Sequence, residues 1–346
     1  MILFGQIFII LIAVHLLTIG SLFVAKRSRI SAKFTASSDH PANIGNSATQ
    51  LGGLVIVPIT LCACFLAFYT LKNIPIYTQL IFCVPFLLLY LIGIIDDFKP
   101  IPAGIRLSIH IANAISVTII IFNITQYSGL GEVVSTLGFI VPSIFMILAI
   151  SWMINSVNFI DGMDLFLVVN IIPGCLFFAL LVLGSLEFYY ISVIFLTFSS
   201  ALLGFVWFNR PKASIYMGDA GTLCIGFLLS SCAIYILARY GSIAGFIPFT
   251  YILTDTTFTL IQRAIKGENV LKSHNNHAYQ IAIRNGKTEN RVRFICFMIS
   301  FANIGMACIC FIVEHSFLGQ FLMASMALAL STFAFFYFRK PKLTHV

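Results

Sequence analysis

The chain has 346 residues, of which 60% are hydrophobic and only 9% are charged. Soluble globular proteins carry about 25% charged residues, so this composition, with a mean hydropathy of +1.01, excludes that class. The formal net charge of +8 does not call for a nucleic-acid partner, because the cytoplasmic loops of membrane proteins are rich in Lys and Arg. The composition therefore predicts an all-α polytopic protein embedded in a lipid bilayer, with no nucleic acid bound.

Apolar runs of about 20 residues, the length that crosses a bilayer, recur along the whole chain. We expect about eleven transmembrane helices, at 3–24, 51–71, 76–95, 105–123, 137–155, 165–184, 187–207, 220–238, 242–262, 294–313 and 316–338. A basic segment and no cleavage site follow the first run, which predicts an uncleaved signal-anchor with the N-terminus outside. Alternating sides from there places every Lys and Arg except Lys72 and Arg239 in cytoplasmic segments or at their edges. The positive-inside rule requires this asymmetry, and it predicts a cytoplasmic C-terminus.

The polar segments between these runs are short, and we find no internal repeat or soluble domain. We therefore predict one integral membrane domain over residues 1–346. The cytoplasmic loops 25–50, 96–104, 156–164, 208–219 and 263–293 are expected to form its active-site face.

Acidic residues are scarce, and their placement is uneven. The chain has 12 Asp and Glu, and three short segments beside predicted spans contain Asp96, Asp97, Asp161, Asp164 and Asp219. Carboxylates at the edge of a bilayer are costly unless they bind something. Magnesium needs few protein carboxylates, because water and phosphate oxygens complete its shell. The pattern indicates a site for a divalent cation and phosphates, although the Asp96–Asp97 pair could equally cap a helix or solvate a loop.

Glycines flank Asp219 immediately before a predicted helix, so free backbone N–H groups could face a phosphate there. Asp219 could also cap that helix. Arg106 and His110 lie one helical turn apart just after the Asp96–Asp97 pair, where they could counter its charge or the charge of a substrate.

The loop 263–293 carries His274 and His277 at a spacing that puts both on one helix face. No cysteine lies nearby to complete a zinc site, so phosphate contact is the better interpretation, with a plain surface loop as the alternative. Asp255 lies inside the ninth predicted span. Such an acid is a functional candidate, but it could instead orient a neighbouring helix through hydrogen bonds, and the sequence leaves both interpretations open.

Four motifs occur in a characteristic order: Asp-Asp after a span, Asn155-x-x-Asn158-x-x-Asp161-Gly-x-Asp164, Met-Gly-Asp-x-Gly, and a late His-x-x-His. Over roughly residues 39–293 this order resembles the polyprenyl-phosphate N-acetylhexosamine-1-phosphate transferases. The form His274-x-x-His277-Ala-Tyr-Gln is similar to the O-antigen-initiating branch. The resemblance implies an enzyme of the bacterial inner membrane with its active site facing the cytoplasm. Such an enzyme transfers a sugar 1-phosphate from a UDP-N-acetyl sugar to undecaprenyl phosphate and releases UMP.

The resemblance also implies roles for individual residues. Asp219, together with Asp161, would bind Mg²⁺, with Mn²⁺ as the alternative ion, and Asp96 and Asp97 would orient the lipid phosphate or act as a base. His274 and His277 would hold phosphate. The candidate substrate-binding residues, from the motifs and the resemblance together, are Asn155, Asn158, Asp164, Asn209, Tyr216, Arg106 and Asp255. Tyr216 matches the aromatic residue that can stack on uracil.

The chain departs from the family pattern in two places. In the first cytoplasmic loop, Asp39-x-Pro41-x-Asn43 leads into Gly45-Asn46-Ser47 and then Gln50-Leu51-Gly52-Gly53, so that two expected basic positions are missing. Leu165 stands where the family usually has Gly. An inactive homologue is therefore one alternative, and a secondary transporter with intramembrane Asp and His is another. The gathering of polar residues at one membrane face favours the transferase. The sequence leaves open the identity of the sugar, a one-step or phospho-enzyme mechanism, and a monomer or homodimer.

Overall fold

The computed structural model describes residues 2–29, 31–34, 48–71, 76–272 and 274–341. Its α-helices are α1 (Ile2–Arg27), α2 (Gly52–Leu71), α3 (Ile76–Phe98), α4 (Ala103–Thr125), α5 (Gly131–Leu137), α6 (Ile140–Phe159), α7 (Phe166–Leu180), α8 (Tyr189–Asn209), α9 (Asp219–Tyr240), α10 (Thr250–Ile265), α11 (Ala278–Arg284), α12 (Glu289–Ile312) and α13 (Phe317–Arg339). Short 3-10 helices lie at η1 (Ser31–Phe34), η2 (Ser128–Leu130), η3 (Leu181–Leu183), η4 (Leu186–Phe188) and η5 (Ile243–Phe249). Within these described ranges no strand forms, and the prediction of an all-α chain is confirmed.

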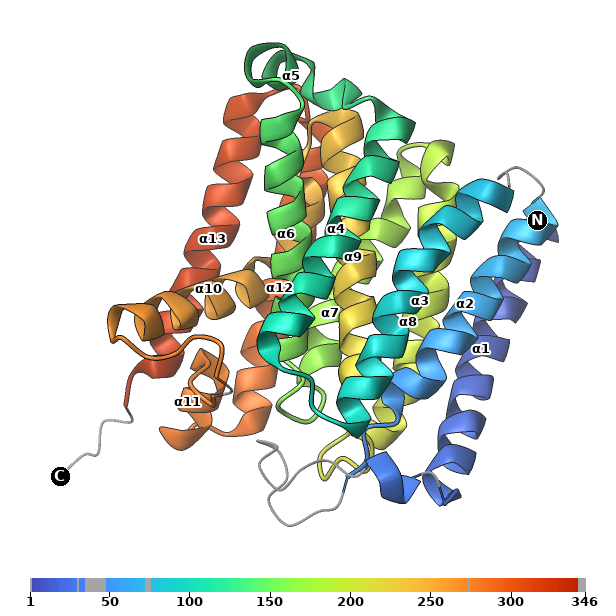
Figure 1. Ribbon diagram of the computed structural model, residues 1–346, viewed down its shortest axis with the longest axis vertical. Helices are drawn as coiled ribbons and strands as arrows, with labels where there is room; N and C mark the ends of the chain where they lie inside the picture. Colours follow the sequence, from blue (N-terminus) through green and yellow to red (C-terminus); the bar gives the residue numbers. More distant parts are fainter. Residues whose placement is uncertain (1, 30, 35–47, 72–75, 273, 342–346) are drawn as a thin grey trace.

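Among the described residues, eight helices are long and apolar enough to cross a membrane. They are α1, α4, α6, α7 with η3, α8, α9, α12 and α13. Most of these helices run in roughly the same direction through one bundle (Figure 1). The chain is thus a multi-pass membrane protein, while the count of eleven spans and the sides on which the termini lie stay predictions.

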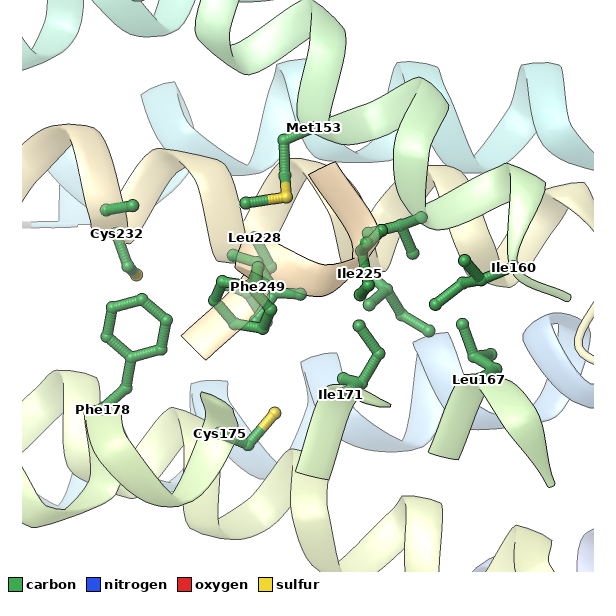
Figure 2. Packing of buried hydrophobic residues seen from close by; sticks show 14 of the residues in the cluster. Met153, Ile160, Leu167, Ile171, Cys175, Phe178, Ile225, Leu228, Cys232 and Phe249 are labelled. Carbon is green, nitrogen blue, oxygen red and sulfur yellow. The ribbon is translucent and has the colours of Figure 1, made fainter. Parts of the chain in front are cut away.

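Helix α9 forms the centre of the bundle and is buried along nearly its whole length. It can pack closely on α6 because it carries Gly226, where an added Cβ would lie 2.6 Å from the Cα of Ile154. Small residues permit such close helix approaches where lipid gives no hydrophobic drive. Figure 2 shows the apolar core beside α9, where Ile225 and Leu228 of α9 belong to the same buried cluster as Ile171 of α7. The core fixes α9, and with it the position of Asp219 at its first turn.

The ninth predicted span, 242–262, is not one continuous helix. It divides into the 3-10 segment η5 and α10, and α10 runs across the direction of the bundle (Figure 1). Pro248 lies inside η5 and has no N–H group to donate. The first residue of α10, Thr250, accepts hydrogen bonds at Oγ1 from Asn303 (2.8 Å) and Ser331 (3.0 Å). These contacts with α12 and α13 hold the break in place.

Candidate functional site

Asp97, at the end of α3, caps the first turn of α9. Its Oδ1 accepts a hydrogen bond from the N–H of Asp219 (2.7 Å), and its Oδ2 accepts one from Ala220 (3.0 Å). The first N–H groups of a helix have no partner within it, and a carboxylate is favourable beside the helix dipole. Gly218 permits the approach, because its φ is +72° and a Cβ there would lie 2.7 Å from Asp97. The expectation that Asp219 caps α9 is therefore wrong, and the cap comes from another helix.

Arg106 of α4 joins the first and third acidic clusters. Its Nη1 lies 2.6 Å from Oδ2 of Asp96 and 3.3 Å from Oδ2 of Asp219. The other oxygen of Asp96 accepts a hydrogen bond from the N–H of Ile101 (2.6 Å). The side chain of Asp96 is buried, whereas that of Asp219 is 20% exposed. The guanidinium thus pairs with Asp96 of the Asp96–Asp97 pair and with Asp219, whose side chain stays partly exposed.

The second cluster reaches the same point from the α6–α7 turn. Oδ2 of Asp161 accepts a hydrogen bond from the N–H of Gly218 (3.1 Å), the residue directly before Asp219. Burial is the main cause that raises the pKa of Asp161 to about 8, and the nearby charge of Asp97 adds to it. The structure therefore brings all three acidic clusters to the N-terminus of α9.

These carboxylates fit a magnesium ion that substrate and water would complete. Arg106 pairs with two of the four, Asp96 and Asp219, whereas Asp97 and Asp161 accept hydrogen bonds from backbone N–H groups at the start of α9. Within the described parts of the chain no three His, Cys, Asp or Glu side chains form a metal cage by themselves. Magnesium usually needs only one or two protein carboxylates beside phosphate oxygens. Asp219 and Asp161 supply that number, whereas Asp97 would have to give up two helix-capping bonds.

Asp164, Asn209 and Tyr216 tie the loop before α9 to the α6–α7 turn. Asp164 accepts hydrogen bonds from the N–H of Ala213 (3.1 Å) and the hydroxyl of Tyr216 (3.5 Å). Asn209 accepts one from the N–H of Leu165 (2.9 Å) and donates one to the carbonyl of Ile215 (3.0 Å). Tyr216 is only 2% exposed, so its ring offers no open face for a uracil, contrary to the expected stacking role. These contacts give all three residues a role in holding the site together.

Asn155 and Asn158 connect α6 to two neighbouring helices, α4 and α9. The Nδ2 of Asn155 lies 3.1 Å from Nδ1 of His110 on α4. Asn158 accepts a hydrogen bond from the hydroxyl of Thr222 on α9 (3.0 Å). Sequence reasoning missed Thr222. Its position one helical turn after Asp219 could have indicated that it lies near the site.

Asp255 orients the histidine loop. Its Oδ1 accepts hydrogen bonds from the N–H of Ala278 (2.8 Å) and from Thr259 (3.1 Å), and it lies 3.5 Å from Nδ1 of His277. Asp255 is 1% exposed, so these contacts favour the orienting role and give no support to direct substrate contact. The His274 ring lies 4.9 Å from that of His277, and burial lowers the pKa of His274 to about 4.

The histidine loop packs against the α6–α7 turn. The hydroxyl of Tyr279 donates to the carbonyl of Phe159 (3.1 Å), and the ring of Phe159 lies 5.4 Å from that of His277. Arg293 donates to the carbonyl of Asp164 (2.9 Å). Sequence reasoning missed Arg293, because a basic residue at a cytoplasmic helix end is ordinary positive-inside charge. The structure thus places His274 and His277 beside the segment that carries Asp161 and Asp164.

Of the departures from the family pattern, Leu165 and the end of the first loop at residues 50–53 lie among the described residues. Asp39, Pro41 and Asn43 lie outside the described residues. Leu165 has a φ of +59°, in the left-handed region that glycine adopts without strain. The chain therefore keeps the backbone turn that a glycine would favour. Because Leu165 has a side chain, its left-handed conformation is less favourable than that of a glycine.

Residues 79–237 match the family model described as glycosyl transferase family 4. The chain is 28% identical to the phospho-N-acetylmuramoyl-pentapeptide-transferase of Bartonella quintana, over 74% of this chain and 78% of that protein. It is 29% identical to the protein of the same name from Prochlorococcus marinus, over 61% of each chain. It is 22% identical to the undecaprenyl-phosphate alpha-N-acetylglucosaminyl 1-phosphate transferase of Thermotoga maritima, over 83% of this chain and 87% of that protein. Over residues 79–237 the chain is thus similar to glycosyl transferase family 4.

Proposed function

We propose that the chain transfers an N-acetylhexosamine 1-phosphate from a UDP-sugar to polyprenyl phosphate at the cytoplasmic face of a bacterial inner membrane. The names of the relatives, which include an undecaprenyl-phosphate sugar 1-phosphate transferase, support this reaction class. The observation that carries the proposal is the meeting of Asp96, Asp161 and Asp219 at the N-terminus of α9. That point lies at one end of the bundle, where a lipid headgroup and a soluble nucleotide can meet.

In the proposed reaction, an oxygen of the lipid phosphate attacks the phosphorus that carries the sugar. A new P–O bond forms, the bond between the two phosphates of the UDP-sugar breaks, and UMP leaves. Phosphoryl transfer depends on positioning and charge neutralisation rather than on covalent help from the protein. A bound Mg²⁺, or Mn²⁺ as the alternative, would supply the charge neutralisation. Asp219 and Asp161 would hold that ion.

The remaining residues have supporting roles in this proposal. Asp96, held by Arg106 at 2.6 Å, would orient the lipid phosphate or accept its proton. Asp97 keeps α9 in place through its two capping bonds. His274, which is more exposed than His277, would contact phosphate from the neighbouring loop.

For the sugar, we propose an N-acetylated UDP-sugar used to start a lipid-linked envelope glycan such as O-antigen. The His274-x-x-His277-Ala-Tyr-Gln form supports that choice. The test incubates purified protein with undecaprenyl phosphate, Mg²⁺ and separate UDP-linked GlcNAc, QuiNAc, FucNAc and MurNAc-pentapeptide, and measures UMP and lipid-linked sugar. We expect product with one of the first three. Product from the MurNAc-pentapeptide alone would refute the O-antigen assignment, and no product from any donor would refute the transferase proposal.

A further inference from the structure

Two cations share one aromatic ring at the end of the bundle where α11, α12 and α13 meet (Figure 1). The Nζ of Lys287 lies 5.1 Å from the centre of the Tyr337 ring, and the Cζ of Arg291 lies 5.8 Å from it. A cation within roughly 6 Å of a ring centre is attracted to the aromatic face. Arg293, two residues further along α12, is buried and donates to the carbonyl of Asp164. Because residues two apart point to different sides of a helix, Arg291 lies on the outer side of α12, at the end of the bundle that carries Asp164.

No carboxylate among the described residues forms an ion pair with either cation of this Lys287–Arg291 pair. Glu289, the nearest acid in the chain, pairs with Arg293 (2.9 Å). Lys287 donates to the backbone carbonyl of Lys340 (2.9 Å). The side chain of Arg291 is exposed, and within the described ranges its guanidinium makes no hydrogen bond. Like charges held close together repel each other, so the pair favours an anion from outside the chain.

Exposed aromatic side chains lie next to this pair on both helices. Phe294 lies one turn from Arg291 on α12 and is 63% exposed, and Phe333 lies one turn before Tyr337 on α13 and is 71% exposed. The rings of Phe333 and Tyr337 are stacked, with centres 6.4 Å apart. Both helices are long and apolar enough to cross a membrane, so their exposed aromatic side chains suit contact with lipid. The surface therefore fits an amphiphile with an anionic head and apolar chains.

We propose that Lys287 and Arg291 bind the phosphate of an anionic phospholipid from the surrounding bilayer, whose acyl chains lie along Phe294 and Phe333. A guanidinium suits this ligand because its planar N–H groups match phosphate oxygens. A zwitterionic phospholipid has a compensating positive charge, so it lacks the net attraction. Every exposed Lys and Arg at a membrane surface attracts anionic lipid to some extent. The site at Tyr337 differs, because the shared ring holds two unpaired cations beside an aromatic lipid-facing surface.

The proposed lipid would lie beside the histidine loop. Helix α11 begins directly after His277, and Asn285 at its end donates from Nδ2 to the carbonyl of Arg339 (3.2 Å). Lys287 makes a similar contact with the carbonyl of Lys340. A lipid held by Lys287 and Arg291 would therefore stabilise the contact between α11 and α13. The binding itself does not depend on the proposed reaction, and its tests use no sugar donor.

The first test measures binding by native mass spectrometry of the purified protein with dioleoylphosphatidylglycerol or dioleoylphosphatidylcholine. Arg291→Gln should weaken binding of phosphatidylglycerol about fivefold, which corresponds to about 1 kcal/mol, the attraction expected from one cation. Arg291→Lys should retain most of the binding, because it keeps the charge. The matched control is Arg27→Gln, since Arg27 is also exposed at a helix end and lies 4.0 Å from a single ring, that of Phe23. Equal losses in Arg291→Gln and Arg27→Gln, or no preference of wild type for phosphatidylglycerol, would overturn the proposal.

The second test locates the lipid. Phosphatidylglycerol with a diazirine in one acyl chain should label peptides that contain Phe294 or Phe333, and Arg291→Gln should reduce that labelling. Unlabelled phosphatidylglycerol should compete, whereas phosphatidylcholine should not. Equal labelling by a diazirine phosphatidylcholine would show ordinary contact with bilayer lipid and would contradict the proposal. Stronger competition by undecaprenyl phosphate than by phosphatidylglycerol would assign the surface to a polyprenyl lipid instead, and would also overturn it.

Discussion

Gly162→Ala tests how the histidine loop is docked on the α6–α7 turn. A Cβ at position 162 would overlap the hydroxyl of Tyr279 and would lie 3.3 Å from Nε2 of Gln280. Tyr279 has little freedom to move away, because it is 1% exposed and its ring lies 4.3 Å from that of Phe166. The hydrogen bond from its hydroxyl to the carbonyl of Phe159 should therefore be lost.

The expected cost has two parts. Losing one hydrogen bond costs about 1 kcal/mol, and inserting a methyl group into a packed core costs about 1–3 kcal/mol. Gly162→Ala should thus destabilise the folded chain by about 2–4 kcal/mol. Because the histidine loop carries His274 and His277, we also expect transferase activity to fall.

The assay is thermal unfolding of the purified protein in detergent, with Gly305→Ala as the control in open space. The decisive comparison is the double variant Gly162→Ala/Tyr279→Phe, which removes the hydroxyl that the new methyl group overlaps. The double variant should be more stable than Gly162→Ala alone. If the losses of the two single variants simply add, the overlap does not determine stability and the reasoning is wrong.

Three further predictions follow from single contacts. At position 165, with its φ of +59°, Gly should give a more stable protein than Ala by about 1 kcal/mol; a higher unfolding temperature for Leu165→Ala would contradict this. Asp255→Asn should keep the fold but lower activity, because Oδ1 can still accept from Ala278 while His277 loses its charged partner; unchanged kcat at normal unfolding temperature would count against the orienting role. Burial lowers the pKa of His274 to about 4, below its ordinary value, so its neutral form is favoured on folding. The stability that this shift contributes is present above pH 6.5 and is lost towards pH 4. Between pH 7 and pH 5 the unfolding temperature of His274→Gln should therefore fall by less than that of wild type. An equal fall for both proteins would contradict the assignment.

Hydropathy predicted the helices well, because a helix that crosses a bilayer must satisfy its own backbone and carry about 20 apolar residues. The exception is the segment 242–262, where apolar composition continues through the change of direction at Thr250. Pro248 was the available signal, because proline removes a backbone donor.

The acidic clusters were also identifiable, since charge is costly at a membrane edge. Their individual contacts were not, because these depend on which helices pack together. Asp97 caps α9 from the end of α3, more than a hundred residues away in the chain, and no local pattern predicts such a partner. The burial of Tyr216 also depends on tertiary packing, because the loop before α9 contacts the α6–α7 turn through Tyr216 and Asp164. The sequence does not reveal that contact.

The most direct test of the central claim compares wild type with Asp219→Asn for Mg²⁺-dependent release of UMP from the preferred UDP-sugar in the presence of undecaprenyl phosphate. The Asn side chain preserves size and keeps an oxygen near Arg106, but it removes the charge proposed to bind the ion. We predict that wild type forms UMP and lipid-linked sugar in equal amounts only with a divalent cation. Asp219→Asn should form neither while unfolding at a normal temperature. Full activity of Asp219→Asn, or wild-type turnover that is indifferent to Mg²⁺, would contradict the account.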